Sequence, residues 1–217
     1  MRIAVDTGPL ISLSSTCLLW LLDKLSFDFY VPPAVVDESY RAPMHTKQYR
    51  FSALRIHKYV TEGRLKTRDL GKDGAKLAEE FTRLANSAYV ARHRPLRIIQ
   101  RGEAEAIILS KQLDNVLLVD ERTIRLLIED PEELKYLLER RTGQNIRHNK
   151  DLTDRIQEMA GDVLMLRSAD LVAYAYEEGI LDGGNKDLVE AALYALKYAG
   201  CAISEQEIQD YISKLGR

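Results

Sequence analysis

The chain has 217 residues, of which 46% are hydrophobic and 29% are charged, and its formal net charge is −2. This composition is typical of a globular protein with one sizeable core and excludes a largely disordered chain. Because the net charge is slightly negative, no global positive field attracts nucleic acid, and any such attraction must come from local basic patches.

Apolar strands alternate with helices along the chain. The predicted strands are residues 2–6, 27–32, 115–119 and 162–166. The predicted helices are residues 10–25, 33–38, 51–62, 72–92, 101–113, 121–142, 150–160, 168–178, 186–199 and 204–215, with a loop at 41–50 and a short segment at 64–70. The alternation indicates an α/β fold with a mostly parallel sheet, in which ligands bind at the carboxyl ends of the strands.

Two of the predicted strands end in an acid. Asp6 follows Ile3-Ala4-Val5, and Asp120 follows the apolar run at 116–119. Parallel strands would bring these carboxylates to one edge of the sheet, where like charges cost free energy unless a cation neutralises them. Clustered oxygen ligands suit Mg²⁺ or Mn²⁺, and no cluster of His or Cys competes with this interpretation. The structural alternative for Asp6 is an N-cap of the following helix.

Further acids lie on the predicted helices. Glu103 and Glu105 are two residues apart, so in a regular helix they point about 200° apart and cannot both face one site. Their structural alternative is a favourable acid near a helix N-terminus. Glu38, on the helix after the second strand, is by itself an ordinary surface acid.

Taken together and in this order, the acidic segments resemble the PIN domain family. The matching segments are Ile3-Ala4-Val5-Asp6-Thr7-Gly8-Pro9-Leu10-Ile11, Val31-Pro32-Pro33-Ala34-Val35-Val36-Asp37-Glu38, Gly102-Glu103-Ala104-Glu105-Ala106-Ile107 and Leu117-Leu118-Val119-Asp120-Glu121-Arg122. The Gly102–Ala106 segment is also similar to the acidic motif of flap endonucleases. The resemblance implies a three-layer α/β/α sandwich with a mostly parallel central sheet, carrying helical insertions, that cuts RNA with Mg²⁺ or Mn²⁺.

The resemblance also implies roles for individual residues. The catalytic carboxylates would be Asp6, Glu38, Glu103 and Asp120. The same four residues, with Glu105 and Glu121 added, would be the metal ligands. Glu121 stands where many relatives carry Asp. The expected substrate contacts are Thr7, Arg92, Arg94, Arg97, Arg101 and Arg122; residues 92–101 contain four arginines and no acid.

We expect residues 1–217 to form a single PIN-like domain with a helical insertion at about 127–161. The insertion, which includes Arg140, Arg141, Arg147 and His148, makes a minimal toxin of the VapC type a poor analogue. RNA is the expected partner, and an antitoxin protein or a second copy of the chain are further candidates. The apolar residues Leu188, Ala191, Ala192, Leu193 and Leu196 would supply either a dimer surface or core.

A cytoplasmic location without a membrane is expected. Asp6 interrupts the first apolar run, and Asp23 and Lys24 follow the second instead of a small-residue cleavage site. No run approaches the roughly 18 apolar residues of a membrane-spanning helix. The widely separated Cys17 and Cys201 favour buried thiols in a reducing compartment.

Three alternatives remain open at the level of sequence. The first is a PIN scaffold that binds RNA or a partner with weak cleavage. The second is an aspartic protease, because Asp6-Thr7-Gly8 is also the active-site triplet of that class, although its chemistry needs two such loops in an all-β fold. The third concerns role, since a toxin and an RNA-processing enzyme would share these residues. A phosphatase of the haloacid dehalogenase type is excluded because position 8 is Gly and not Asp.

Overall fold

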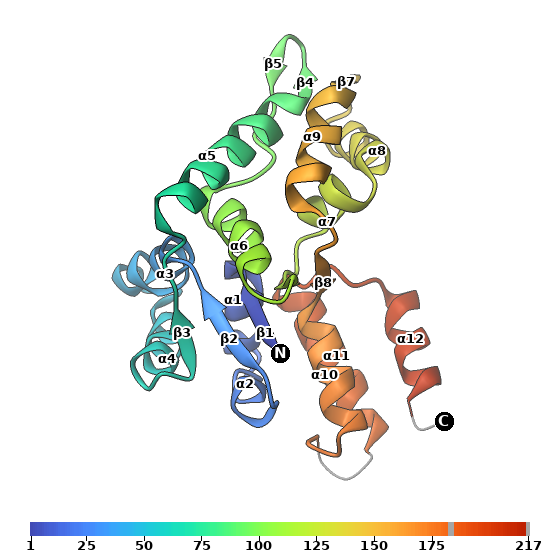
Figure 1. Cartoon of the computed structure of the whole chain (residues 1–217). Coiled ribbons are helices and arrows are strands. Elements are labelled where there is room, and N and C mark those ends of the chain that lie inside the picture. Colours follow the sequence, from blue (N-terminus) through green and yellow to red (C-terminus); the bar gives the residue numbers. More distant parts are fainter. Residues whose placement is uncertain (182–184, 216–217) are drawn as a thin grey trace.

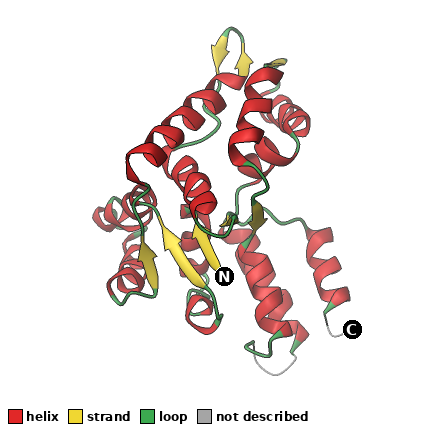
Figure 2. Cartoon of the chain, in the orientation of Figure 1, coloured by secondary structure: helices red, strands yellow, loops and turns green. Residues whose placement is uncertain are grey.

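The computed structural model describes residues 1–181 and 185–215 and contains a five-stranded parallel sheet in the order β3-β2-β1-β6-β8 (Figure 1). Its strands are β1 (Arg2–Val5), β2 (Asp28–Val31), β3 (Leu65–Thr67), β6 (Val116–Leu118) and β8 (Leu164–Leu166). Helices flank this sheet (Figure 2), as the three-layer α/β/α prediction requires. The fold class is therefore confirmed.

The helices are short to medium in length. They are α1 (Thr7–Ser15), α2 (Leu21–Lys24), α3 (Pro33–Val36), α4 (Arg50–Thr61), α5 (Gly71–Ala88), α6 (Arg101–Gln112), α7 (Arg122–Glu129), α8 (Pro131–Thr142), α9 (Lys150–Ala160), α10 (Ser168–Glu177), α11 (Lys186–Ala199) and α12 (Glu205–Lys214). A π-helical turn, η1 (Asp37–Arg41), and a 3₁₀ turn, η2 (Pro43–His45), occupy part of the expected loop at 41–50. α6 packs on β1 and β6, and α1 contacts α10 and α11.

The central strands are the most deeply buried part of the molecule. Ile3, Ala4 and Val5 of β1 are fully buried, and every residue of β6 is buried. A strand between two layers of helices has no solvent-facing side, which explains why these segments are continuous apolar runs without alternation. The same core cluster continues into the later helices through Leu193 and Leu196.

The segment predicted as an insertion forms a second layer of structure above the main sheet. It contains the end of α7, then α8, β7 (Ile146–His148) and α9. β7 pairs antiparallel with β4 (Tyr89–Ala91), which also pairs with β5 (Arg94–Pro95). In Figure 1 this small sheet lies at the top, beyond α5 and α9. The insertion is thus joined to the chain before α6 by a strand pair.

Several predicted elements differ in extent. The helix expected over 121–142 is two helices, because Asp130 caps the second and Pro131 occupies its first turn. The helix expected over 10–25 ends at Ser15 and resumes only at Leu21. β3, β4, β5 and β7 were not predicted as strands, since runs of two or three residues carry no measurable periodicity.

The apolar residues of α11 belong mostly to the core. Ala192, Leu193 and Leu196 are buried within the single chain, whereas Leu188 is partly exposed. Packing inside the chain therefore explains most of this apolar stretch. Across residues 1–181 and 185–215, no helix has both the length and the apolar character needed to cross a bilayer.

Candidate active site

Two carboxylates lie side by side where adjacent parallel strands end. Val5 of β1 is in register with Leu118 of β6, and the Asp6 amide donates a hydrogen bond of 3.0 Å to the Leu118 carbonyl. Asp6 and Asp120 are only 3% and 2% exposed. They open onto a hollow of about 420 Å³, which we call the acidic pocket. Its lining residues are Asp6, Thr7, Gly8, Glu38, Gln100, Glu103, Asp120, Glu121, Arg122, Arg141, Gly200 and Ala202.

Asp6 caps a helix with one carboxylate oxygen and leaves the other oxygen without a partner. Its Oδ2 accepts a hydrogen bond of 3.3 Å from the Gly8 amide, so it caps α1. Its Oδ1 is buried and has no hydrogen-bond partner among the described residues. Burial raises the pKa of Asp6 from 3.8 to about 7. A buried, unpartnered carboxylate oxygen is costly unless a proton or a cation completes its surroundings.

Glu38 reaches the pocket from the π-helical turn. Its Oε2 accepts from the Thr7 hydroxyl at 3.3 Å, and its Oε1 accepts from the Gly102 amide at 3.2 Å. A Cβ placed on Gly102 would lie 2.9 Å from the Glu38 carboxyl carbon. Gly102 is therefore the residue that lets Glu38 approach α6. Thr7, a predicted substrate contact, lines the pocket, and its hydroxyl donates to Glu38.

Glu103 completes the acidic group from the first turn of α6. Its Oε2 accepts a hydrogen bond of 2.5 Å from the Gln100 amide. Burial, followed by the charge of Asp6, raises the pKa of Glu103 well above its ordinary value. Asp6 and Glu103 therefore oppose each other's ionisation across the pocket.

Asp120 is fixed more firmly than the other acids. Its Oδ1 accepts from the Ser168 amide and its Oδ2 from the Ser168 hydroxyl, both at 2.8 Å. These bonds satisfy the first amide of α10 and set the orientation of the carboxylate. Cys201 lies beside it, and burial and then the Asp120 charge raise the pKa of that thiol. Asp120 keeps free lone pairs on both oxygens, since a carboxylate has about four acceptor sites.

The donor chemistry of the acidic pocket fits a hard divalent cation. All candidate ligands are carboxylate oxygens, which Mg²⁺ and Mn²⁺ prefer, and one of them is the unpartnered Oδ1 of Asp6. Within residues 1–181 and 185–215, no three His, Cys, Asp or Glu side chains are arranged so that they could hold an ion as they stand. Holding a cation would therefore require the carboxylates to turn toward one another.

Glu105 does not face the acidic pocket. It is buried, its Oε2 accepts from the Ala34 amide at 3.0 Å, and its Oε1 accepts from Arg101 Nε at 2.6 Å. Its position two residues after Glu103 turns it to another side of α6. The structure thus places this predicted metal ligand away from the other acids, at the N-terminus of α3. Arg101, a predicted substrate contact, is the ion-pair partner of Glu105.

The arginine cluster predicted to hold substrate is also remote from the acidic pocket. Arg92 lies in the turn between β4 and β5, Arg94 is in β5, and Arg97 follows it. None of the three lines the acidic pocket. In Figure 1 the β4–β5 hairpin is at the opposite end of α5 from the main sheet. These three arginines are therefore not part of the acidic pocket.

Other pocket residues were not predicted as site residues. Arg141, at the end of α8, lines the pocket, and its Nη1 donates to the Thr123 hydroxyl at 3.4 Å. Gly200 and Ala202 enter from the segment after α11. The Ala202 amide donates a hydrogen bond of 2.9 Å to the Asp120 carbonyl. No local motif marks these positions, because only the tertiary fold brings them to the strand ends.

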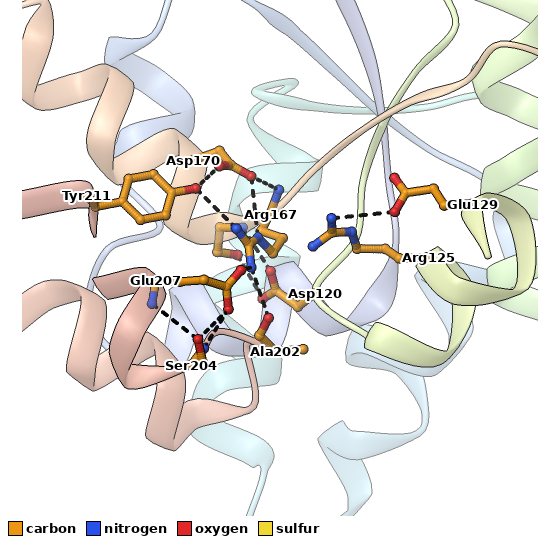
Figure 3. A network of polar contacts seen from close by, with 10 residues as sticks. Asp120, Arg125, Glu129, Arg167, Asp170, Ala202, Ser204, Glu207 and Tyr211 are labelled. Carbon is orange, nitrogen blue, oxygen red and sulfur yellow. Dashed lines mark hydrogen bonds and ion pairs between the residues drawn. The ribbon is translucent and has the colours of Figure 1, made fainter. Parts of the chain in front are cut away.

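A polar network lies directly behind Asp120 (Figure 3). Arg167 donates to Glu207 at 2.7 Å, to the Ala202 carbonyl at 3.1 Å and to the Tyr211 hydroxyl at 3.2 Å. Burial opposes the charge of Arg167, but Glu207, Tyr211 and Asp170 together outweigh it, and the pKa of the guanidinium is raised. Burial also opposes the charge of Glu207, but hydrogen bonds from Ser204 and Arg167 lower its pKa to about 2. The network ties α12 to the edge of the site.

Comparison with known families assigns this chain to a class. The family model DUF3368, which describes a PIN domain, matches residues 2–132, more than half of the chain. The chain therefore belongs to the PIN domain family, as the sequence resemblance predicted. PIN domains are typically nucleases and generally use divalent metal ions. The chain matches no curated protein and no solved structure.

Proposed function

We propose that this chain is an endoribonuclease that depends on Mg²⁺ or Mn²⁺ and cuts RNA at the acidic pocket. The observation that carries the proposal is the buried, unpartnered Oδ1 of Asp6, next to a second carboxylate, Glu103, whose ionisation it opposes. Such an arrangement is stable as a charged pair only with a compensating cation. Membership of a family of nucleases supports the same assignment.

Each carboxylate has a defined task in this proposal. Asp6, Glu38, Glu103 and Asp120 hold the cation, and Glu121, which also lines the pocket, is a further ligand. Bound Mg²⁺ or Mn²⁺ supplies positive charge at the phosphate and a more acidic water. Ser168 fixes Asp120, and Thr7 with Gly102 fixes Glu38. Arg122 and Arg141 at the edge of the pocket offset the phosphate charge.

The test is cleavage of labelled single-stranded RNA in Mn²⁺, Mg²⁺ or EDTA. The protein should cut only with metal and should leave a 5′-phosphate. Asp6→Asn is a suitable inactive variant because Asn remains a good N-cap for α1, so the fold is kept. Cleavage that continues in EDTA, or that Asp6→Asn retains, would contradict the proposal.

A second function, an RNA- or protein-binding scaffold with weak cleavage, is favoured by one observation. The described side chains do not converge on a single ion as they stand, and both oxygens of Asp120 already accept hydrogen bonds from Ser168. Metal-independent RNA binding by a correctly folded protein, with no cleavage in Mn²⁺, would support this alternative. Two roles suit the endonuclease itself, RNA processing and the toxin of a toxin–antitoxin pair. An adjacent gene for a small antitoxin would favour the second.

A further inference from the structure

A second hollow adjoins the acidic pocket and is lined by arginines. Its volume is about 540 Å³, and we call it the arginine pocket. Its lining residues are Arg122, Arg125, Leu126, Glu129, Arg167, Ala202, Ile203, Ser204 and Glu207. Arg122 and Ala202 line both hollows, so the two lie next to each other. A strand whose phosphate occupied the acidic pocket would run next to this surface.

Arg167 forms the floor of the arginine pocket. Its side chain is only 9% exposed, and Glu207 and the Ala202 carbonyl hold one guanidinium nitrogen, Nη1. Figure 3 shows Arg167 at the centre of the network behind Asp120. A buried guanidinium that its partners already hold in place is pre-organised, so it loses little side-chain entropy when it binds an anion.

Arg125 faces the same hollow and is poorly satisfied. Its Nε is buried and has no hydrogen-bond acceptor among the described residues. Its ion pair from Nη2 to Glu129 is 3.6 Å long, which is beyond a normal hydrogen bond. In Figure 3 the guanidinium of Arg125 points toward Arg167. Two like charges that face one hollow repel each other unless an anion lies between them.

We infer that the arginine pocket binds a backbone phosphate of single-stranded RNA, next to the phosphate that is cut. Guanidinium groups bind phosphate through two parallel hydrogen bonds, and Arg125 has unused donors for such a contact. The pocket has three arginines against two glutamates, whereas the acidic pocket is dominated by carboxylates. In this inference the positive charges that hold the strand next to the cut are those of the arginine pocket. The inference deepens the proposed function and rests on it for the position of the cut.

The first experiment measures binding without cleavage. Fluorescence anisotropy of a short labelled single-stranded RNA is followed in EDTA with the full chain and with Arg125→Gln. Loss of a charged hydrogen bond should weaken binding about tenfold. The slope of log K against log salt should also become shallower by about 0.7, the value for one lost phosphate contact on a single strand. Arg125 is half-buried on α7, so unfolding curves of Arg125→Gln establish that the variant is folded before its affinity is compared.

A matched control removes the same charge elsewhere. Arg83 is exposed on α5 and lines a different hollow, which shares no residue with either the acidic or the arginine pocket. Arg83→Gln should bind RNA as the parent does. Glu129→Gln tests the opposite direction, because it removes the carboxylate that competes for Arg125, and it should bind RNA more tightly than the parent. Arg125→Lys should fall between parent and Arg125→Gln, since it keeps the charge and loses the fork.

The outcomes separate this inference from the proposed function. Equal affinities of the parent and Arg125→Gln, or an equal loss in Arg83→Gln, would overturn the phosphate site even if the protein cuts RNA. A selective loss in Arg125→Gln would support the site even if Mn²⁺ gives no cleavage. A DNA strand of the same sequence should show the same loss, because phosphate contacts do not read the sugar. A loss confined to RNA would overturn the assignment to phosphate.

Discussion

At the scale of single residues, the carboxylates of the acidic pocket destabilise one another when they are charged, unless a proton or a cation neutralises them. Asp6 is buried with one oxygen unpartnered, and the half-buried Glu103 lines the same pocket. Gly102 permits this crowding, because its missing side chain leaves room for the Glu38 carboxylate. The two features lead to separate predictions, one on stability and one on cleavage.

The first prediction concerns pH and stability in EDTA. The pKa of Asp6 in the folded chain, about 7, is raised above its ordinary value of 3.8. The stability that this group contributes is therefore fully present below about pH 4 and is lost as pH rises through about 7, by on the order of 4 kcal/mol. The raised pKa of Glu103 extends the loss to higher pH.

Urea unfolding at about pH 5 and pH 8 measures the effect. The parent should be less stable at the higher pH, and Asp6→Asn should show a smaller difference. Mn²⁺ at the higher pH should restore the parent and have less effect on the variant. A parent whose stability rises between the two pH values would contradict the assignment of a raised pKa to Asp6.

The second prediction concerns Gly102. In Gly102→Ala the new methyl group would overlap the Glu38 carboxylate, so Glu38 must move away from its place in the pocket. A displacement of about 1 Å in a catalytic group commonly costs about 100-fold in rate, so RNA cleavage should fall by about that factor. Gly74→Ala is the control, since its Cβ would lie 2.8 Å from Leu70 Cβ, in a part of α5 that does not line the acidic pocket. It should lower stability but leave the activity per folded molecule unchanged.

At the scale of elements, α6 carries two acids with different tasks. Glu103 faces the acidic pocket, while Glu105 accepts the Ala34 amide at the start of α3 and pairs with Arg101. The buried Glu105 carboxylate thus joins α6 to α3, and η1, which carries Glu38, follows α3 directly. The link holds α6 against α3 and lies outside the acidic pocket.

A third prediction follows for Glu105→Gln. The variant keeps the size of the side chain but presents an amide group where Ala34 and Arg101 both donate. Loss of hydrogen bonds from a buried carboxylate should lower the free energy of unfolding by about 1–3 kcal/mol. Denaturant unfolding measures this change. An unchanged unfolding midpoint would contradict the structural role of Glu105.

The elements that sequence predicts best are the long apolar ones. Strands 2–6 and 115–119 were identified because their residues are buried on both faces, and the acids that end them do lie together in the structure. The 3.6-residue period likewise separates Glu103 from Glu105. The short strands β4, β5 and β7, and the approach of Arg141 and Arg167 to the strand ends, depend on tertiary packing that no local pattern records.

At the scale of the whole molecule, the acidic pocket needs more of the chain than the segment that the family model matches. That match ends at residue 132, but β8, Ser168, Arg141 and Ala202 come from beyond it. β8 pairs with β6 through Leu164–Leu166, and Ser168 orients Asp120. The later part of the chain therefore completes both the sheet and the site.

A fourth prediction tests this dependence with a fragment of residues 1–132. Without β8 and α10, the edge of β6 and the apolar side of α1 are exposed to water, and Asp120 loses both of its hydrogen bonds. The fragment should show no cooperative unfolding transition by circular dichroism and should not cut RNA in Mn²⁺. A fragment that unfolds cooperatively and cuts RNA would show that the later segments are dispensable.

The most direct test of the account compares two carboxylates in one cleavage assay. Labelled single-stranded RNA is incubated in Mn²⁺ with the parent, with Asp6→Asn and with Glu105→Gln. The account predicts that Asp6→Asn loses at least about 100-fold in rate, a typical cost of removing a group that acts in the transition state. Glu105→Gln should cut at the rate of the parent per folded molecule. Cleavage by Asp6→Asn at the parent's rate, or an equal loss in both variants, would contradict the assignment of the active site to the acidic pocket.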